Sequence, residues 1–192
     1  MNGFERRKEK KKEDIRRAAL ELFQSYGFKK VSIDEIARKA GVSQVTIYNH
    51  FGSKDELVRN CIRTFLHNIM EKFKRIMGSD KPFNQKLELI VLDKTDIAGQ
   101  FQGELMQTVY QLDPEFMESF WKNEVAQITM DFCEEGRKQG FISPEISNEA
   151  LQLYFEIIRR GVVSSSYMQM DAVKNTKIIQ DLIKLFTYGL NG

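Results

Sequence analysis

The stretch at positions 43–50, SQVTIYNH, concentrates side chains that donate and accept hydrogen bonds. They are two amides, three hydroxyls and an imidazole, at Gln44, Asn49, Ser43, Thr46, Tyr48 and His50. On a helix, Ile47 would point inward and the polar groups would share the outer surface. Amides match the donor and acceptor pattern of base edges, whereas hydroxyls suit phosphate oxygens. The stretch therefore predicts a surface that binds nucleic acid through hydrogen bonds.

Two short helices are expected around this stretch. Ser32 and Glu35 have the spacing of a capping box, which predicts a helix of about nine residues that closes at Gly41. Ser43 caps the next helix, which runs to about His50. Two short helices joined by a turn with a glycine free to adopt positive φ are typical of a helix-turn-helix, whose second helix enters the major groove of DNA.

Longer helices are expected on both sides. Apolar residues at helical spacing predict a helix over about 9–26 that stops at Gly27. Ser53 with Glu56 is a second capping box, which opens a helix over about 54–77. Further helices are expected at about 83–97, 101–111, 114–138, 146–170 and 173–189. No alternating strand pattern or internal repeat is visible, so an all-α fold of about nine helices is predicted.

Charge and composition limit the possible partners. Residues 1–60 hold 14 Lys and Arg against 9 Asp and Glu, a net +5, while the other 132 hold 15 against 18, a net −3. The basic first third favours a polyanion partner. The alternative for residues 1–8 is a solvated, disordered tail. No window is long and apolar enough for a membrane span, and residues 1–17 are charged where a signal peptide would be apolar, so we expect a cytoplasmic protein with two free cysteines.

The order of these features resembles the TetR/AcrR family of bacterial transcriptional regulators. The match covers about residues 10–60 and includes FQSYGF, followed by VSIDEIARKAGVSQVTIYNHFGSKDEL. The resemblance implies a helix-turn-helix domain over 1–53 with a basic arm at 1–12. It also implies a helical ligand-binding and dimerisation domain over 54–192, with the helix from Lys54 connecting the two. Repression is the family's common mode.

The resemblance also implies roles for individual side chains. Base contacts would come from Gln44, Val45 and Asn49. Phosphate contacts would come from Ser32, Ser43, Thr46, Tyr48, His50 and Lys54. Val45 departs from the family pattern, because a small residue is common there, so base preferences of relatives do not transfer. The basic arm, together with Arg16 and Arg17, is either a further contact to phosphate or the minor groove or a solvated helix start.

Two further surfaces are expected in the second domain. Dimer contacts would come from the last two helices, at Tyr154, Ile158, Gly161, Val162, Ile179, Leu182 and Phe186, with plain intramolecular core as the alternative. A pocket for a small hydrophobic or amphipathic inducer would be lined by Phe101, Met106 and Trp121, although bulky residues at helical spacing also suit an ordinary core. The expected partners are a palindromic double-stranded operator, a second copy of the chain and an unidentified inducer.

Other classes of protein fit the sequence less well. The chain has no phosphate-binding loop, no GxGxxG and no nucleophile–base pairing, so neither enzymatic activity nor a cofactor is expected. His67 and Glu71 lie one helical turn apart, a spacing that suits a metal ion, but two surface residues are the simpler interpretation. A protein that coats DNA without sequence preference is the remaining alternative, because basic charge alone suffices for it.

Overall fold

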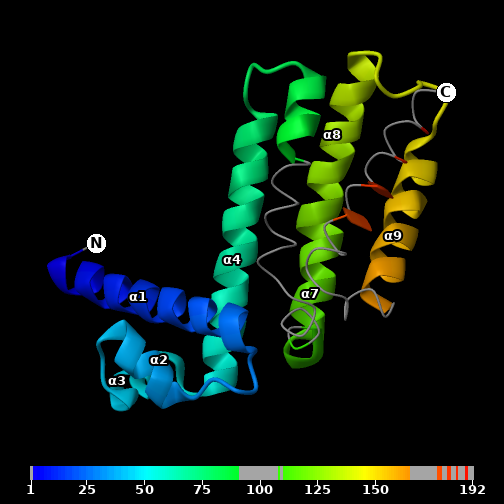
Figure 1. Cartoon of the computed structure of the whole chain (residues 1–192). Helices are drawn as coiled ribbons and strands as arrows, with labels where there is room; N and C mark the ends of the chain where they lie inside the picture. The colour runs from blue at the N-terminus through cyan, green and yellow to red at the C-terminus, as the bar shows by residue number, and fades with distance from the viewer. Residues whose placement is uncertain are drawn as a thin grey trace. The chain divides into compact units, whose positions relative to one another are not determined.

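The computed structural model describes residues 2–90, 108, 110–164, 177–178, 181–182, 185 and 189, with side chains left out at 162–164. Every regular element in this part of the chain is helical, as the sequence predicts (Figure 1). The chain divides into two compact units. Unit 1 comprises residues 1–67 and 104–114, and unit 2 comprises residues 68–103 and 115–192.

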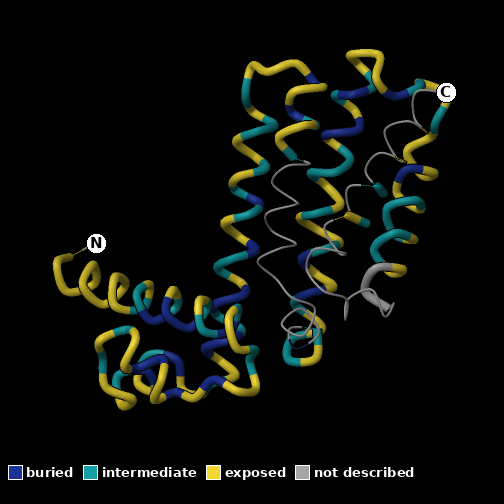
Figure 2. Tube along the Cα trace, viewed as in Figure 1, coloured by how far each residue is buried: buried dark blue, intermediate teal, exposed yellow. Residues whose placement is uncertain are grey.

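Unit 1 is built from α1 (Gly3–Tyr26), α2 (Ile33–Ala40), α3 (Gln44–Phe51) and the first part of α4 (Lys54–Met77). In Figure 1, α2 and α3 lie together on one side of α1. Their inner faces are apolar and buried (Figure 2), with the core formed by Ile15, Ala19, Phe23, Ile36, Ile47, Phe51, Leu57 and Val58. A small core of this kind fixes the outer face of α3.

The first helix is longer than the sequence analysis predicted. It begins at Gly3 rather than near Glu9, and Asn2 is its N-cap. The Asn2 side-chain oxygen accepts hydrogen bonds from the backbone N–H groups of Phe4 and Glu5. In return, the Glu5 carboxylate accepts a hydrogen bond from the backbone N–H of Asn2. This is a complete capping box. The basic arm is therefore helical, which excludes the disordered-tail alternative.

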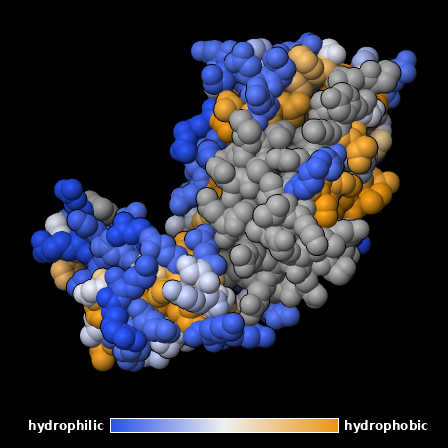
Figure 3. Space-filling view, in the orientation of Figure 1, coloured by the Kyte–Doolittle hydropathy of each residue, from blue (hydrophilic) through white to orange (hydrophobic). Residues whose placement is uncertain are grey.

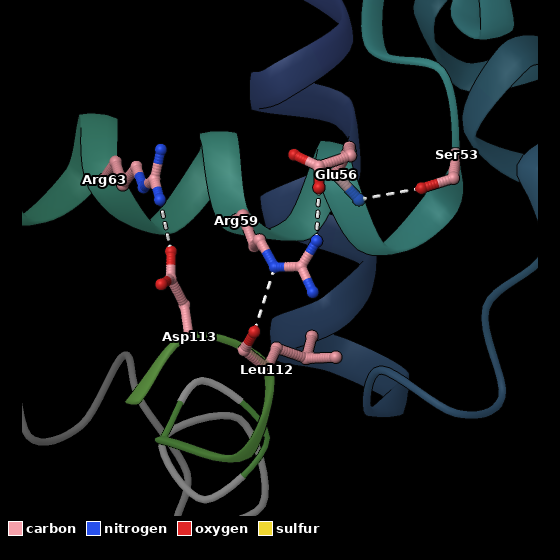
Figure 4. Close-up of polar contacts among 6 residues, drawn as sticks. All are labelled: Ser53, Glu56, Arg59, Arg63, Leu112 and Asp113. Atoms are coloured by element: carbon pink, nitrogen blue, oxygen red, sulfur yellow. Dashed lines mark hydrogen bonds and ion pairs between the residues drawn. The ribbon is translucent and has the colours of Figure 1, made fainter. Parts of the chain in front are cut away.

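The opening of α4 also differs from its prediction. The Ser53 hydroxyl accepts a hydrogen bond from the Glu56 amide at 3.1 Å, as expected for a cap. The Glu56 carboxylate, however, pairs with Arg59 in the next turn (Figure 4). The predicted capping box is thus half formed, because a guanidinium one turn along the helix competes for the carboxylate.

Unit 2 contains the rest of α4, a helix at 83–90, α7 (Pro114–Phe120) except its first residue, η1 (Trp121–Val125), α8 (Ala126–Lys138) and α9 (Asn148–Ser164). The helix predicted over 114–138 has the predicted ends. Its middle, η1, is a wider π-turn, which the periodicity did not indicate. The helix predicted from 146 begins at Asn148, and the ends of the helices predicted over 83–97, 146–170 and 173–189 fall outside the described residues.

The core of unit 2 combines tight packing with one buried charge. Phe83 stacks on Phe132 at 4.5 Å between ring centroids. Lys86 is 5% exposed, and its ammonium donates to the Met77 carbonyl and to the Glu135 carboxylate, at 2.7 and 2.8 Å. These contacts join the C-terminal end of α4, the helix at 83–90 and α8. Within the described residues, no helix has both the length and the apolar character needed to cross a membrane.

Candidate nucleic-acid interface

The turn between α2 and α3 is held by local hydrogen bonds. Gly41 adopts a left-handed conformation, with φ 66° and ψ 35°, and the amide of Val42 donates to the Ala37 carbonyl at 3.0 Å. Ser43 then caps α3, because its hydroxyl accepts from the Thr46 amide at 3.1 Å. Ile47 is fully buried. The sequence prediction of two capped helices around a glycine turn is confirmed.

The outer face of α3 is open to solvent. Gln44 and Asn49 are exposed, as are Val45 at 66% and Tyr48 at 48%. The Asn49 amide makes no hydrogen bond within the described part of the chain. By contrast, the Gln44 amide donates to the Asp34 carboxylate of α2 at 2.9 Å. The three side chains predicted to contact bases therefore share one exposed face, and one of them is held in a fixed orientation.

Two of the predicted phosphate-binding hydroxyls are paired with each other. The oxygens of Ser43 and Thr46 lie 2.9 Å apart, and either can be the donor. Ser43 also accepts the Thr46 amide. The pair uses one of the two hydroxyl hydrogens, so the other remains able to donate outward. One phosphate contact from this pair is thus available without breaking the cap.

Unlike the Ser43–Thr46 pair, Ser32 uses its only hydroxyl hydrogen within the N-cap of α2. Its hydroxyl donates to the Glu35 carboxylate at 2.7 Å and accepts the Glu35 amide at 3.2 Å. Hydrogen bonding to Ser32 lowers the pKa of Glu35. Because the single hydroxyl hydrogen is used, Ser32 needs to rearrange before it can donate to a phosphate.

The basic arm lies near the end of α3. Burial and the positive charges of Lys12, Lys8 and Lys11 lower the pKa of His50. Most of the arm's basic side chains are exposed, and Figure 3 shows a hydrophilic surface over this part of α1. Arg16 differs, because it is half-buried and donates to Asn60 at 3.2 Å and to Glu9 at 2.9 Å. Arg16 therefore joins α1 to α4 rather than facing outward.

Lys54 is placed differently from a free surface cation. Its ammonium donates to the Phe28 carbonyl at 2.8 Å and lies 4.3 Å from the centroid of the Phe28 ring. Burial lowers its pKa. Two of its three N–H donors remain for other contacts. This link could not be predicted from the sequence, because Phe28 is 26 residues away and no short-range spacing signals it.

Two arginines of α4 bind the segment that precedes α7. The Arg59 guanidinium donates to the Leu112 carbonyl at 3.0 Å, and Arg63 pairs with Asp113 (Figure 4). All four residues belong to unit 1. Pro114, the first residue of α7, follows Asp113 directly. The part of α4 next to the candidate interface is thus tied to the residues that lead into unit 2.

One of the residues predicted to line a ligand pocket lies in the described part of the chain. Trp121 opens the π-turn η1, and its indole nitrogen is buried with no hydrogen-bond partner among the residues that the structure describes. π-turns within helices occur frequently at functional sites. Phe101 and Met106 lie outside the described residues. The pocket formed by these three residues therefore stays a prediction.

The predicted dimer residues are only partly described. Tyr154 and Ile158 are half-buried and Gly161 is exposed, while Leu182, which is also helical, is half-buried. The side chain of Val162, together with Ile179 and Phe186, lies outside the description. The large apolar residues exposed on α9 are Leu153 at 61% and Ile157 at 59%. Figure 3 shows apolar surface over this helix.

These features define a class, a helix-turn-helix domain joined to a second helical unit. Residues 15–61 match the family profile described as bacterial regulatory proteins, tetR family. The regulator YvdT of Bacillus subtilis is 29% identical over 100 residues, 52% of this chain and 51% of YvdT, so the chain spans about half the length of that relative. The repressor KstR2 of Rhodococcus jostii is 26% identical over 148 residues, 73% of this chain and 71% of KstR2.

Solved structures give the same fold. The regulator FadR from Bacillus subtilis, in complex with stearoyl-CoA, aligns with a TM-score of 0.57 and 19% identity over 88% of this chain and 96% of its own. The profile match, the relatives and the capped helix-turn-helix agree. Residues 15–61 thus form a regulatory domain of the TetR family of transcriptional regulators, a family that is not enzymatic.

Proposed function

We propose that the protein is a ligand-responsive repressor that binds a palindromic operator as a homodimer in the bacterial cytoplasm. The observation that carries the proposal is the exposed face of α3, where Gln44, Val45, Tyr48 and Asn49 project from a helix whose other side is buried. A helix held in this way can enter the major groove with its first residues towards the bases. A protein that coats DNA through charge alone does not need such a face.

The proposed contacts divide by chemistry. Gln44, Val45 and Asn49 read bases, because amides recognise base edges and a branched apolar side chain fits the methyl group of thymine. Tyr48, His50, Lys54 and the Ser43–Thr46 pair contact phosphates, and Ser32 does so after release from Glu35. The exposed lysines of the α1 arm add phosphate contacts beside His50. Phosphate contacts position the protein and strengthen binding, whereas base contacts select the sequence.

Dimerisation would supply the second half-site. One helix-turn-helix reads only a few base pairs, and two copies on a two-fold axis meet half-sites about 34 Å apart. The exposed apolar residues Leu153 and Ile157 support α9 as part of the interface, together with the residues predicted from sequence. In this proposal, residues 1–53 bind DNA and 54–192 bind ligand and the second copy, with α4 connecting them.

A small molecule would release the operator. The buried indole nitrogen of Trp121 supports a ligand with a hydrogen-bond acceptor, since an unpaired buried donor is costly unless something else satisfies it. KstR2 is a repressor, and the FadR structure contains stearoyl-CoA. A hydrophobic or amphipathic compound is therefore the proposed class, with Phe101, Met106 and Trp121 as lining residues.

Coupling between ligand and DNA would pass through α4. Arg59 and Arg63 bind Leu112 and Asp113, and Lys54 binds the loop that precedes α2. A shift of the segment before α7 would therefore pull on the helix that positions the DNA-binding face. Such coupling is typically worth about 1 to 3 kcal/mol, and the ligand must bind one state better than the other.

Selection of DNA tests the central claim. The purified protein is incubated with random duplexes, and the retained DNA is sequenced. We expect an inverted repeat, and we expect Gln44→Ala to relax preference at one position of each half-site. Retained fragments that share no motif would support the DNA-coating alternative instead. A palindromic fragment in competition with random duplex provides the affinity ratio.

The ligand claim has its own test. Thermal stability is measured with and without stearoyl-CoA as the first probe, because a compound that binds the native state raises its apparent stability. A compound that stabilises the protein should also weaken operator binding. An operator affinity unchanged by saturating amounts of such a compound would contradict the proposed release.

A further inference from the structure

The contact between Gln44 and Asp34 links the first residue of α3 to the first turn of α2. The Gln44 amide nitrogen donates to one Asp34 carboxylate oxygen at 2.9 Å, and Arg38 donates to the other oxygen at 2.8 Å. All three side chains are exposed. The carboxylate is thus held from both sides at the edge of the face proposed to meet DNA.

An ionised carboxylate accepts hydrogen bonds and cannot donate them. It therefore binds the nitrogen end of the Gln44 amide and excludes the oxygen end. An unrestrained glutamine can rotate its amide by half a turn and present donor and acceptor in either order. With Asp34 in place, one order remains, with the amide oxygen away from Asp34 and one N–H still free.

This orientation has a consequence for base recognition. In the major groove, adenine presents the N7 acceptor and the N6 donor, whereas guanine presents two acceptors, N7 and O6. The restrained amide, with one acceptor and one free donor, complements adenine. At guanine its oxygen would face O6, and both atoms are acceptors. Only the rotated amide, which turns its NH2 group outward, suits guanine.

We propose that Asp34 is a positioning residue for sequence recognition, which makes Gln44 select adenine over guanine by fixing the orientation of its amide. The proposal rests on the proposed function, since it requires Gln44 to read a base. Asp34 itself needs no contact with DNA. Its negative charge repels phosphates, so it serves selectivity at some expense of general affinity.

The test is a set of duplexes that differ only at the position that responds to Gln44→Ala. For the unmodified chain we expect a preference for adenine over guanine of roughly five- to a hundred-fold, the range of a good bidentate contact. In Asp34→Ala the preference should fall to a few-fold through better binding of guanine. Binding of random duplex should be equal or tighter. Asp34→Asn, which accepts and donates, should give an intermediate ratio.

Two further variants separate positioning from a structural role. In a Gln44→Ala background, Asp34→Ala should change no base preference. Asp55→Ala removes an equal charge from the first turn of α4, and it should alter the affinity of all duplexes alike. Preferences at positions assigned to Asn49 should survive in Asp34→Ala. If they are lost together with the adenine preference, Asp34 supports the fold of the turn and the proposal is wrong.

The failures of the two proposals are distinguishable. A chain that shows no sequence preference contradicts the proposed function. A chain that binds an inverted repeat and responds to Gln44→Ala, but keeps its full adenine preference in Asp34→Ala, contradicts only the role of Asp34. Thermal melting of each variant excludes unfolding as the cause.

Discussion

Around α2 and α3, the side chains of Ser32, Ser43 and Asp34 lie at the surface and bind partners three to ten residues away in the chain, whereas Lys86 in unit 2 is buried and binds Glu135, 49 residues away. Ser32, Ser43 and Asp34 hold neighbouring polar groups in place. Those groups can still form hydrogen bonds with an external partner. Lys86 and Glu135 use their contacts internally. The first arrangement suits recognition and the second suits stability.

Glycines in the two regions also have different roles. Gly41 is needed for its left-handed backbone, and a Cβ there would meet no atom within 4 Å. Gly136 in α8 is needed for space, because a Cβ there would lie 2.6 Å from the Phe83 ring. Substitutions should therefore change DNA binding in the first region and folding stability in the second.

The largest effect is expected at Lys86. Lys86→Met removes the ammonium that binds the Met77 carbonyl and Glu135, and it leaves Glu135 without its charge partner in a mostly buried position. We expect a loss of about 3 kcal/mol in the free energy of unfolding, measured by urea denaturation. Lys74→Met, which removes an exposed pair with Glu71, should leave stability nearly unchanged.

Adding Glu135→Gln to Lys86→Met sharpens this prediction. The second change removes the uncompensated charge, so the double variant should recover part of the lost stability. A double variant less stable than Lys86→Met would mean that packing of the side chains, rather than charge, dominates at this site.

A smaller loss is expected at Gly136. In a helix interior, alanine normally stabilises relative to glycine by about 1 kcal/mol. At Gly136 the new Cβ would overlap Phe83, so Gly136→Ala should instead destabilise by about 2 kcal/mol. The measurement is again urea denaturation.

Gly161→Ala is the matched control. Within one chain, no described atom lies within 4 Å of the Cβ position of Gly161 in α9, so at concentrations at which the protein is monomeric, alanine should stabilise it by about 0.5 to 1 kcal/mol. A loss of stability that grows as the protein is concentrated would place Gly161 in a dimer contact. If Gly136→Ala were also more stable than the unmodified chain, Gly136 and Gly161 would not differ in the space available for a Cβ.

The part of the fold that could be predicted from sequence is the part set by neighbours in the chain. Ser32, Gly41 and Ser43 act over three or four residues, so their spacing was sufficient to locate α2, the turn and α3. Asn2 and Glu5 have the same spacing and open α1 at Gly3, six residues before the start that the apolar periodicity predicts. The exposed face of α3 followed from the position of Ile47.

What could not be predicted depends on contacts distant in sequence. Neither the π-turn at Trp121 nor the hydrogen bond from Lys54 to Phe28 produces a periodic pattern in the sequence. In α9, apolar residues occupy more than one face, so the pattern could not show that Leu153 and Ile157 are more exposed than Tyr154 and Ile158. The orientation of Gln44 required the position of Asp34 on another helix.

Lys54 is expected to contribute both to folding stability and to DNA binding. Lys54→Met keeps the aliphatic chain but loses the hydrogen bond to the Phe28 carbonyl, so stability should fall by about 1 kcal/mol. If its remaining donors contact phosphate, the slope of log K against log salt should also decrease in magnitude by about one. A stability loss with an unchanged slope would limit Lys54 to a structural role.

The smallest effect is expected from His50, and it concerns binding alone. Burial and the charges of Lys12, Lys8 and Lys11 lower its pKa below the ordinary value of 6.5, while Glu9 opposes this shift. A bound phosphate favours the protonated imidazole and raises the pKa, so binding takes up a proton between the two values. Affinity for DNA should therefore increase as the pH falls through the region at and below 6.5.

The size of this effect is limited, because one proton changes affinity by at most about tenfold per pH unit. The operator dissociation constant is measured from pH 8 to pH 5.5 at constant ionic strength. His50→Gln should reduce the pH dependence, and His67→Gln should preserve it. A pH dependence equal in His50→Gln and the unmodified chain would mean that the imidazole does not contact phosphate, and that the lysines of α1 carry the charge of this edge alone.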